Sequence, residues 1–134
     1  MENNNFGFRF RDWDIYKDAL KFRNDINELL KTLPKEEKYD LIDQGKRALN
    51  SIILNIAESA NKNSDKDTRL YINRAQCSLD EVVACLDCAL QDGYITQSQH
   101  AKALEKASSL AKRLKAFTVH LSSNIGQGSR INSQ

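Results

Sequence analysis

The spacing of hydrophobic residues along the chain predicts four long helices. Apolar residues recur at intervals of three and four, which is the period of one helix face, and no segment shows the alternation of a half-buried strand. We expect helices over about residues 12–32, 35–61, 66–91 and 96–122. The predicted core positions include Trp13, Tyr16, Ala19, Leu20, Ile26, Leu29, Leu30 and Leu33, then Leu70, Ala75, Leu79, Val82, Leu86 and Leu90, and finally Leu104, Ala107, Leu110, Ala111, Leu114, Phe117 and Leu121.

Local signals mark where these helices begin and end. Pro34 ends the first helix and suits the first turn of the second. Ser64 or Asp65 can cap the third helix, and Asp92-Gly93 ends it. Thr96 and Gln99 match a capping box at the start of the fourth helix. Because short connections favour antiparallel neighbours, we expect an all-α, antiparallel up-down-up-down four-helix bundle over residues 12–122. Residues 1–11 are interpreted as an N-terminal extension and residues 123–134 as a flexible C-terminal tail.

Composition narrows the class of protein only slightly. A chain of 134 residues suits one domain, and a net charge of +2 does not by itself identify a polyanionic partner. No apolar run is long enough to cross a bilayer and the N-terminus lacks the order of a signal peptide, so we expect no membrane contact and a cytoplasmic location. Three cysteines agree with a reducing compartment.

The basic residues are concentrated in the fourth predicted helix. We call Lys102, Lys106, Lys112 and Arg113 the basic ridge, since all four lie away from the predicted core face, with Glu105 as the interrupting carboxylate. Such a ridge could contact a nucleic-acid backbone, or it could be the solvated side of the bundle. The ridge contains no interleaved aromatic residues for base stacking.

Metal and redox sites are weighed against core packing. Cys85-x-x-Cys88 has the spacing of half a zinc site, but no second ligand pair follows, so these cysteines and Cys77 are interpreted as small core residues. Neither histidine has a glutamate three residues before it, which excludes a carboxylate-bridged metal bundle. We expect no metal and no cofactor.

One enzymatic motif remains as the alternative. Arg113 and His120 are separated by six residues, which resembles the signature of the helical HEPN ribonucleases and places both side chains on one helix face. The polar residue that usually follows the arginine is Leu114 here, so we expect a protein without catalytic activity.

The second predicted helix carries an unusual polar stripe. Its members recur at helical spacing and are Gln44, Arg47, Ser51, Asn55 and Glu58. Short amides and hydroxyls suit partial burial, either through hydrogen bonds inside the same bundle or at a subunit interface. Periodicity does not choose between these two hypotheses.

These residues also carry a family resemblance. The matching residues are Pro34-Lys35-Glu36-Glu37, Tyr39, Leu41, Gln44, Arg47-Ala48, Ser51-Ile52 and Asn55-Ile56-Ala57-Glu58, followed by Ala75, Ser78 and Glu81. Over about residues 8–121 the chain resembles the "four helix bundle protein" family, encoded within intervening sequences of bacterial 23S ribosomal RNA genes. The resemblance implies that Ser78 and Glu81 belong with the polar stripe, as residues that either hydrogen-bond within the bundle or lie at a subunit interface.

The resemblance implies a homopentameric bundle without known catalysis that binds RNA or DNA. It also implies kinship with accessory proteins of diversity-generating retroelements, which use a basic surface to contact nucleic acid and a reverse transcriptase. We therefore expect a non-enzymatic accessory or scaffold protein whose partners are its own copies, a nucleic acid and, in the retroelement setting, a reverse transcriptase.

Overall fold

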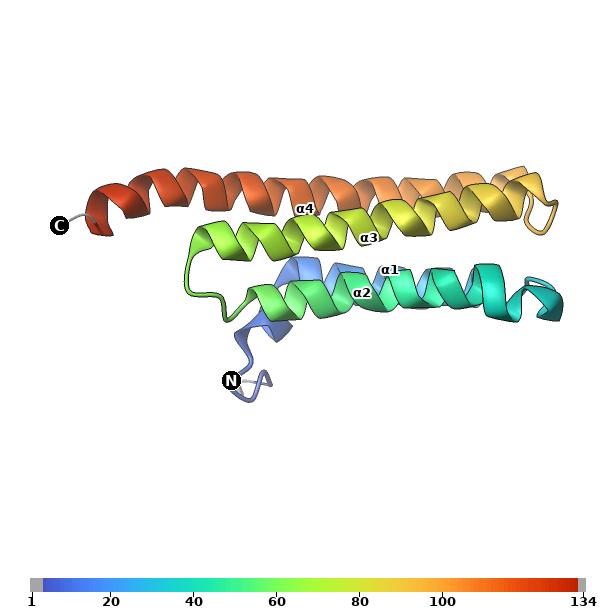
Figure 1. Cartoon of the computed structure of the whole chain (residues 1–134), viewed down its shortest axis with the longest axis horizontal. Coiled ribbons are helices and arrows are strands. Elements are labelled where there is room, and N and C mark those ends of the chain that lie inside the picture. The colour runs from blue at the N-terminus through green and yellow to red at the C-terminus, as the bar shows by residue number, and fades with distance from the viewer. Residues whose placement is uncertain (1–3, 133–134) are drawn as a thin grey trace.

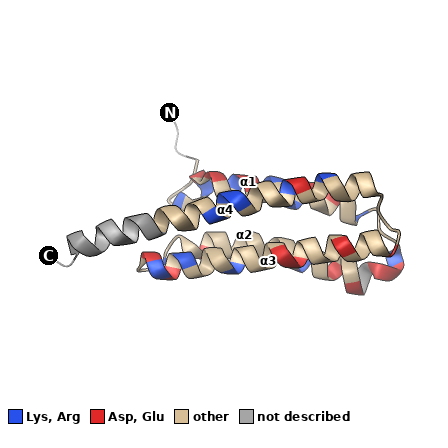
Figure 2. Cartoon of the chain, turned by 90° about the horizontal axis from the view of Figure 1, so that it is seen from above, with Lys and Arg blue, Asp and Glu red and all other residues tan. Residues whose placement is uncertain are grey.

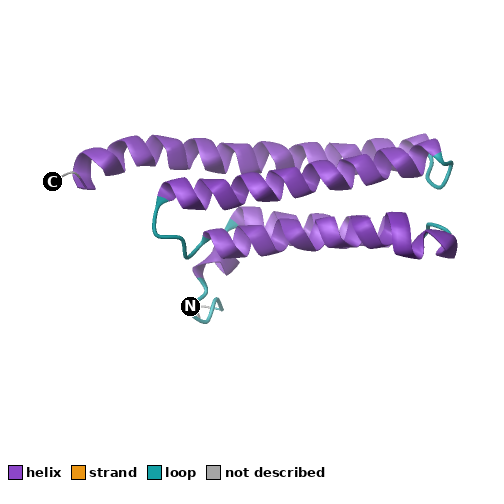
Figure 3. Cartoon of the chain, viewed as in Figure 1, coloured by secondary structure: helices purple, strands orange, loops and turns teal. Residues whose placement is uncertain are grey.

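The computed structural model describes the backbone of residues 4–132 and the side chains of residues 4–37 and 40–121. Within these residues the protein is helical and contains no strand (Figure 3). The main helices are α1 (Asp14–Leu30), α2 (Asp43–Ser59), α3 (Asp65–Gln91) and α4 (Gln97–Asn132). Shorter helical segments are η1 (Arg9–Asp12), η2 (Lys35–Glu37) and η3 (Lys38–Ile42).

The four helices form a bundle, which confirms the predicted fold. Consecutive helices run in opposite directions, with α1 and α2 on one side and α3 and α4 on the other (Figure 1). The most extensive packing joins α2 to α3 and α3 to α4. Apolar faces of all four helices meet along the axis of the bundle, and fully buried side chains there include Ile26, Leu30, Leu49, Ile52, Ile56, Ile72, Leu86 and Leu114.

Both predicted ends of α3 and the predicted start of α4 are confirmed. The Ser64 hydroxyl caps α3 by accepting a hydrogen bond of 3.1 Å from the Asp67 N–H. Gly93 follows α3 with φ at +75°, a conformation that favours glycine. Thr96 and Gln99 form a reciprocal capping box at the start of α4, with hydrogen bonds of 2.8 and 3.0 Å.

Part of the predicted core on α3 is wrong. Leu70 is 46% exposed, and Cys77 and Cys88 are exposed too, whereas Cys85 is buried. The buried face of α3 is instead set by Ile72 and the positions three, seven, ten, fourteen and seventeen residues after it. Leu70, Cys77 and Cys88 are displaced by about 140° or more from the centre of that face, so they meet solvent.

The start of the second helix also differs from prediction. Residues 35–42 form a 3₁₀ turn and a π-helical turn, and the α-helix begins only at Asp43. A tertiary contact holds this segment, because Tyr94 Oη donates a hydrogen bond of 3.2 Å to Glu37 Oε2. Gly45 follows in α2 where a Cβ would lie 3.0 Å from Leu30 Cδ1, so the end of α1 approaches α2 closely.

The fourth helix is longer than predicted. The backbone remains helical to Asn132, whereas the sequence suggested a helix end near residue 122 and a flexible tail beyond it. Extending an existing helix gains one backbone hydrogen bond for each residue added and requires no new nucleation step. The helix can therefore continue past the position at which the sequence suggested an end. The side chains after Leu121 lie outside the described residues.

Candidate nucleic-acid interface

The basic ridge lies on the exposed surface of α4, but half of its charge is paired. Lys106 Nζ lies 3.2 Å from Asp25 Oδ2, and the Arg113 guanidinium contacts the carboxylate of Asp18. Both carboxylates come from α1, and Figure 2 shows both signs of charge along α1 beside the cations of α4. Exposed pairs of this kind add little stability, yet they reduce the positive potential of the ridge.

The other two cations of the ridge are available for a ligand. Lys102 and Lys112 are exposed and make no ion pair within the described part of the chain. The sequence could not show the pairing of the other two, because Asp18 and Asp25 lie more than eighty residues away in the chain. Assignment of the ridge to nucleic acid stays a prediction.

A second cationic surface lies between α1 and α2. We call it the α1–α2 groove; it has a volume of about 310 Å³ and is lined by Arg23, Asn24, Asn27, Glu28, Lys31, Lys46 and Asn50. Only α1 and α2 line it, and their inner faces form the core, so the groove opens on the side away from α3 and α4. Three cations meet one carboxylate there, which leaves a positive surplus.

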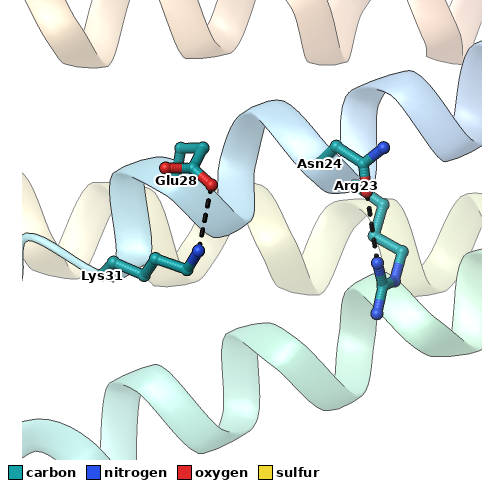
Figure 4. Close-up of polar contacts among 4 residues, drawn as sticks. All are labelled: Arg23, Asn24, Glu28 and Lys31. Atoms are coloured by element: carbon teal, nitrogen blue, oxygen red, sulfur yellow. Dashed lines mark hydrogen bonds and ion pairs between the residues drawn. The ribbon is translucent and has the colours of Figure 1, made fainter.

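Amides rather than carboxylates hold the arginine of this groove. Arg23 Nε donates to Asn50 Oδ1 at 2.8 Å, and Nη1 donates to Asn24 Oδ1 at 3.3 Å. Figure 4 shows Arg23 extending from α1 toward α2, with Glu28 and Lys31 further along the chain. Glu28 and Lys31 form an ion pair of 3.0 Å. Because neutral acceptors orient the guanidinium, its charge is not cancelled.

Two further groups complete the groove. Lys46 makes no ion pair within the described residues. Asn27 Oδ1 is buried in the groove wall and has no hydrogen-bond partner among the described residues. The groove can therefore contact phosphates through its cations and hydrogen-bond to a sugar or a base through its exposed amides, Asn24 and Asn50.

Sequence reasoning missed the groove although a signal was present. Arg23, Asn27 and Lys31 follow one another at four-residue steps on α1, and Lys46 and Asn50 do the same on α2. Four-residue spacing places the members of each row on one helix face, as it does for the polar stripe of α2. What the sequence did not contain is that the two rows face each other.

The polar stripe of α2 makes hydrogen bonds inside the bundle at its centre and is exposed at its ends. Its centre is structural: Ser78 and Ser51 share a hydrogen bond of 2.8 Å that joins α3 to α2, and Asn55 Nδ2 donates to the Ser51 backbone oxygen at 2.9 Å. Gln44, Arg47 and Glu58 are exposed. Among the described residues, Arg47 pairs with Asp43 at 2.9 Å and Glu58 pairs with Lys62 at 3.8 Å, each four residues away in the chain. Glu81 on α3 is exposed as well.

Arg113 and His120 both lie on the exposed surface of α4, and the described histidines and cysteines do not gather into a metal site. Arg113 is engaged by Asp18, and His120 is exposed seven residues further along α4. The other histidine, His100, pairs with Asp87 at 2.7 Å between α4 and α3. Among the described residues no group of three or more His, Cys, Asp and Glu could hold a metal ion. The pKa of the Cys85 thiol is raised, mainly by burial and to a smaller extent by Cys88 and Glu81.

The fold and these surfaces define a small four-helix bundle with two exposed rows of cations. Its described residues include no helix able to span a membrane. The chain belongs to the 23S rRNA-intervening sequence protein family, whose model matches residues 11–116. It is also similar to a crystal structure from Bacteroides thetaiotaomicron, described as a protein of unknown function from the S23 ribosomal protein family. That likeness has a TM-score of 0.71 and 26% identity, and covers 78% of this chain and 97% of the other. A search of curated proteins found no match.

Proposed function

We propose that this protein is a non-enzymatic, cytoplasmic accessory or scaffold protein that binds nucleic acid. The observation that carries the proposal is the α1–α2 groove, where three cations converge against one carboxylate and amides present further polar contacts. Membership of a family described by ribosomal RNA intervening sequences agrees with RNA as the first nucleic acid to test. The resemblance to retroelement accessory proteins adds a reverse transcriptase as a protein partner to test.

Binding to RNA is expected to fall steeply as salt rises. Cations that neutralise phosphates release condensed counterions, so the logarithm of the affinity falls linearly with the logarithm of the salt concentration, by about 0.7 for each contact with a single strand. Fluorescence anisotropy with a labelled RNA measures this slope, and gel analysis afterwards is expected to show intact RNA. Absence of binding at low salt, a slope of zero, or cleaved RNA would each contradict the proposal.

We also propose that the protein assembles as a homo-oligomer, with the pentamer implied by the family resemblance as the expected form. Support comes from the exposed ends of the polar stripe, Gln44, Arg47 and Glu58, which the bundle itself does not bury. A closed ring would repeat each cationic surface, so one RNA could contact several copies at once.

Native mass spectrometry is expected to find a single multiple of the chain mass. Arg47→Glu should reduce that assembly, because it places a second carboxylate next to Asp43, which Arg47 contacts at 2.9 Å, and presents like charge to Glu58 of a neighbouring copy. Lys21→Glu, which reverses an exposed charge on α1, serves as the control. A monomer at every concentration would remove the assembly proposal without affecting the binding proposal.

A further inference from the structure

The N-terminal segment holds two exposed aromatic rings among arginines. Residues 6–11 read Phe-Gly-Phe-Arg-Phe-Arg, and side chains of Phe6 and Phe8 are 79% and 56% exposed. Large aromatic residues are costly to leave in water, so two neighbouring exposed rings require an explanation. The third ring, Phe10, packs edge-on against Tyr16 at a centroid distance of 4.9 Å and anchors the segment to α1.

The backbone of Phe6 is held in a conformation that aromatic residues rarely adopt. Its φ is +53°, in the left-handed region, which costs a bulky residue about 1–3 kcal/mol. Asn5 maintains the turn: its side chain is buried at 8% exposure, its Oδ1 accepts from the Gly7 N–H at 2.9 Å, and its Nδ2 donates to Asp12 Oδ2 at 2.7 Å. A strained turn secured by a buried amide therefore presents the exposed ring.

Both arginines are fixed next to aromatic rings. Arg11 lies 5.5 Å from the centroid of Phe6 and donates through Nη1 to the Asn4 carbonyl at 2.8 Å. Arg9 lies 5.8 Å from the Trp13 ring and donates to the carbonyl of Ala60, at the end of α2. Both arginines remain exposed. Carbonyl oxygens and rings, unlike carboxylates, leave the positive charge of each guanidinium available to an anion.

We propose that Phe6, Phe8, Arg9 and Arg11 form a stacking platform for the unpaired bases of single-stranded nucleic acid. Exposed aromatic faces beside cations are the parts that bind single strands without sequence preference: each base stacks on a ring, and the guanidinium groups contact phosphates. A duplex keeps its bases stacked on one another and cannot offer those faces. This inference rests on the proposed nucleic-acid function and names the form of nucleic acid that is bound.

The position of the platform agrees with the α1–α2 groove. The N-terminal segment projects from the α1–α2 side of the bundle, away from α3 and α4 (Figure 1). The groove is lined by residues of α1 and α2 and therefore lies on the same side. Arg23 lies nine residues along α1 from Asp14, which is about 14 Å at the rise of an α-helix. A single strand a few nucleotides long could therefore place bases on the platform and phosphates in the groove.

The test compares a single-stranded RNA of mixed sequence with the duplex formed by that strand and its complement. Stacking on one ring is expected to strengthen single-strand binding about 10-fold. The Phe6→Ala, Phe8→Ala double variant should therefore lose about 100-fold in affinity for the single strand and less than about 3-fold for the duplex. Phe6→Tyr with Phe8→Tyr keeps both aromatic faces and should restore single-strand binding. Val119→Ala, an exposed apolar residue on α4, is the matched control.

A second variant separates binding from folding. Phe6→Gly relieves the left-handed strain at φ +53°, so its melting temperature should be equal to or above that of wild type while its single-strand affinity falls. If wild type binds neither RNA, the proposed function fails. If wild type binds and the double variant loses nothing, or loses equally on single strand and duplex, only the platform is rejected. A change in the number of copies by native mass spectrometry, with RNA affinity retained, would instead make these rings a subunit contact.

Discussion

Replacing Arg23, Lys31 and Lys46 together with glutamine is expected to lower the affinity for single-stranded RNA about 100-fold at about 0.1 M salt. Each phosphate contact contributes about 0.7 to the salt slope, so three contacts account for about two powers of ten between 0.1 and 1 M salt. The slope itself should become shallower by about 2. Anisotropy titrations at several salt concentrations measure both quantities, and circular dichroism checks that the bundle is intact.

The basic ridge provides the comparison for the groove variant. Lys102, Lys106, Lys112 and Arg113 changed together to glutamine should weaken binding no more than the groove variant does, although four charges are removed rather than three. Lys106 and Arg113 already contact Asp25 and Asp18, as Lys31 contacts Glu28, so each variant removes two cations that an RNA phosphate can reach without displacing a carboxylate. A larger loss from the ridge variant than from the groove variant would move the nucleic-acid site to α4.

Leu49→Ala is expected to lower the free energy of unfolding by about 2–5 kcal/mol, because it removes apolar contacts and leaves a cavity in a packed core. The Leu49 side chain is 0% exposed and lies among residues of the core cluster. Urea denaturation followed by circular dichroism measures the change, and the midpoint should fall without a large change in slope.

Leu54→Ala is the matched control, since it makes the same substitution five residues later on the same helix. Its side chain is 65% exposed, so truncation should cost no more than about 0.5 kcal/mol. Helix propensity is identical in the two experiments, and the difference between them isolates burial. Equal destabilisation by the two variants would mean that α2 is oriented differently from the structure, or that Leu54 is buried in an assembly.

The exposure of some residues in the candidate sites could be predicted from the sequence, whereas the contacts between helices could not. The exposure of Lys102, Lys106, Lys112 and Arg113 followed from helix periodicity and is confirmed. The pairing of Lys106 and Arg113 with carboxylates of α1 joins residues that are distant in sequence, and so does the hydrogen bond between Arg23 on α1 and Asn50 on α2. The aromatic and arginine residues of the N-terminal segment were visible, but their exposure was not, because a segment without helical period gives no burial signal.

The sequence by itself determined the four helices, most of their ends and the bundle fold, because hydrophobic periodicity and capping residues such as Ser64, Thr96 and Gly93 act over a few residues. Tertiary structure alone decided which side chains face each other. It interrupted the start of the second helix beside Glu37 and Tyr94 and assembled the groove from two helices. The exposure of Leu70 and Cys88, by contrast, follows from their angle to the other core positions of α3, which the helix period contains. The physical reason is that a helix period fixes the relative angles of residues on one helix, whereas the rotation of that helix in the bundle is set by packing against its neighbours.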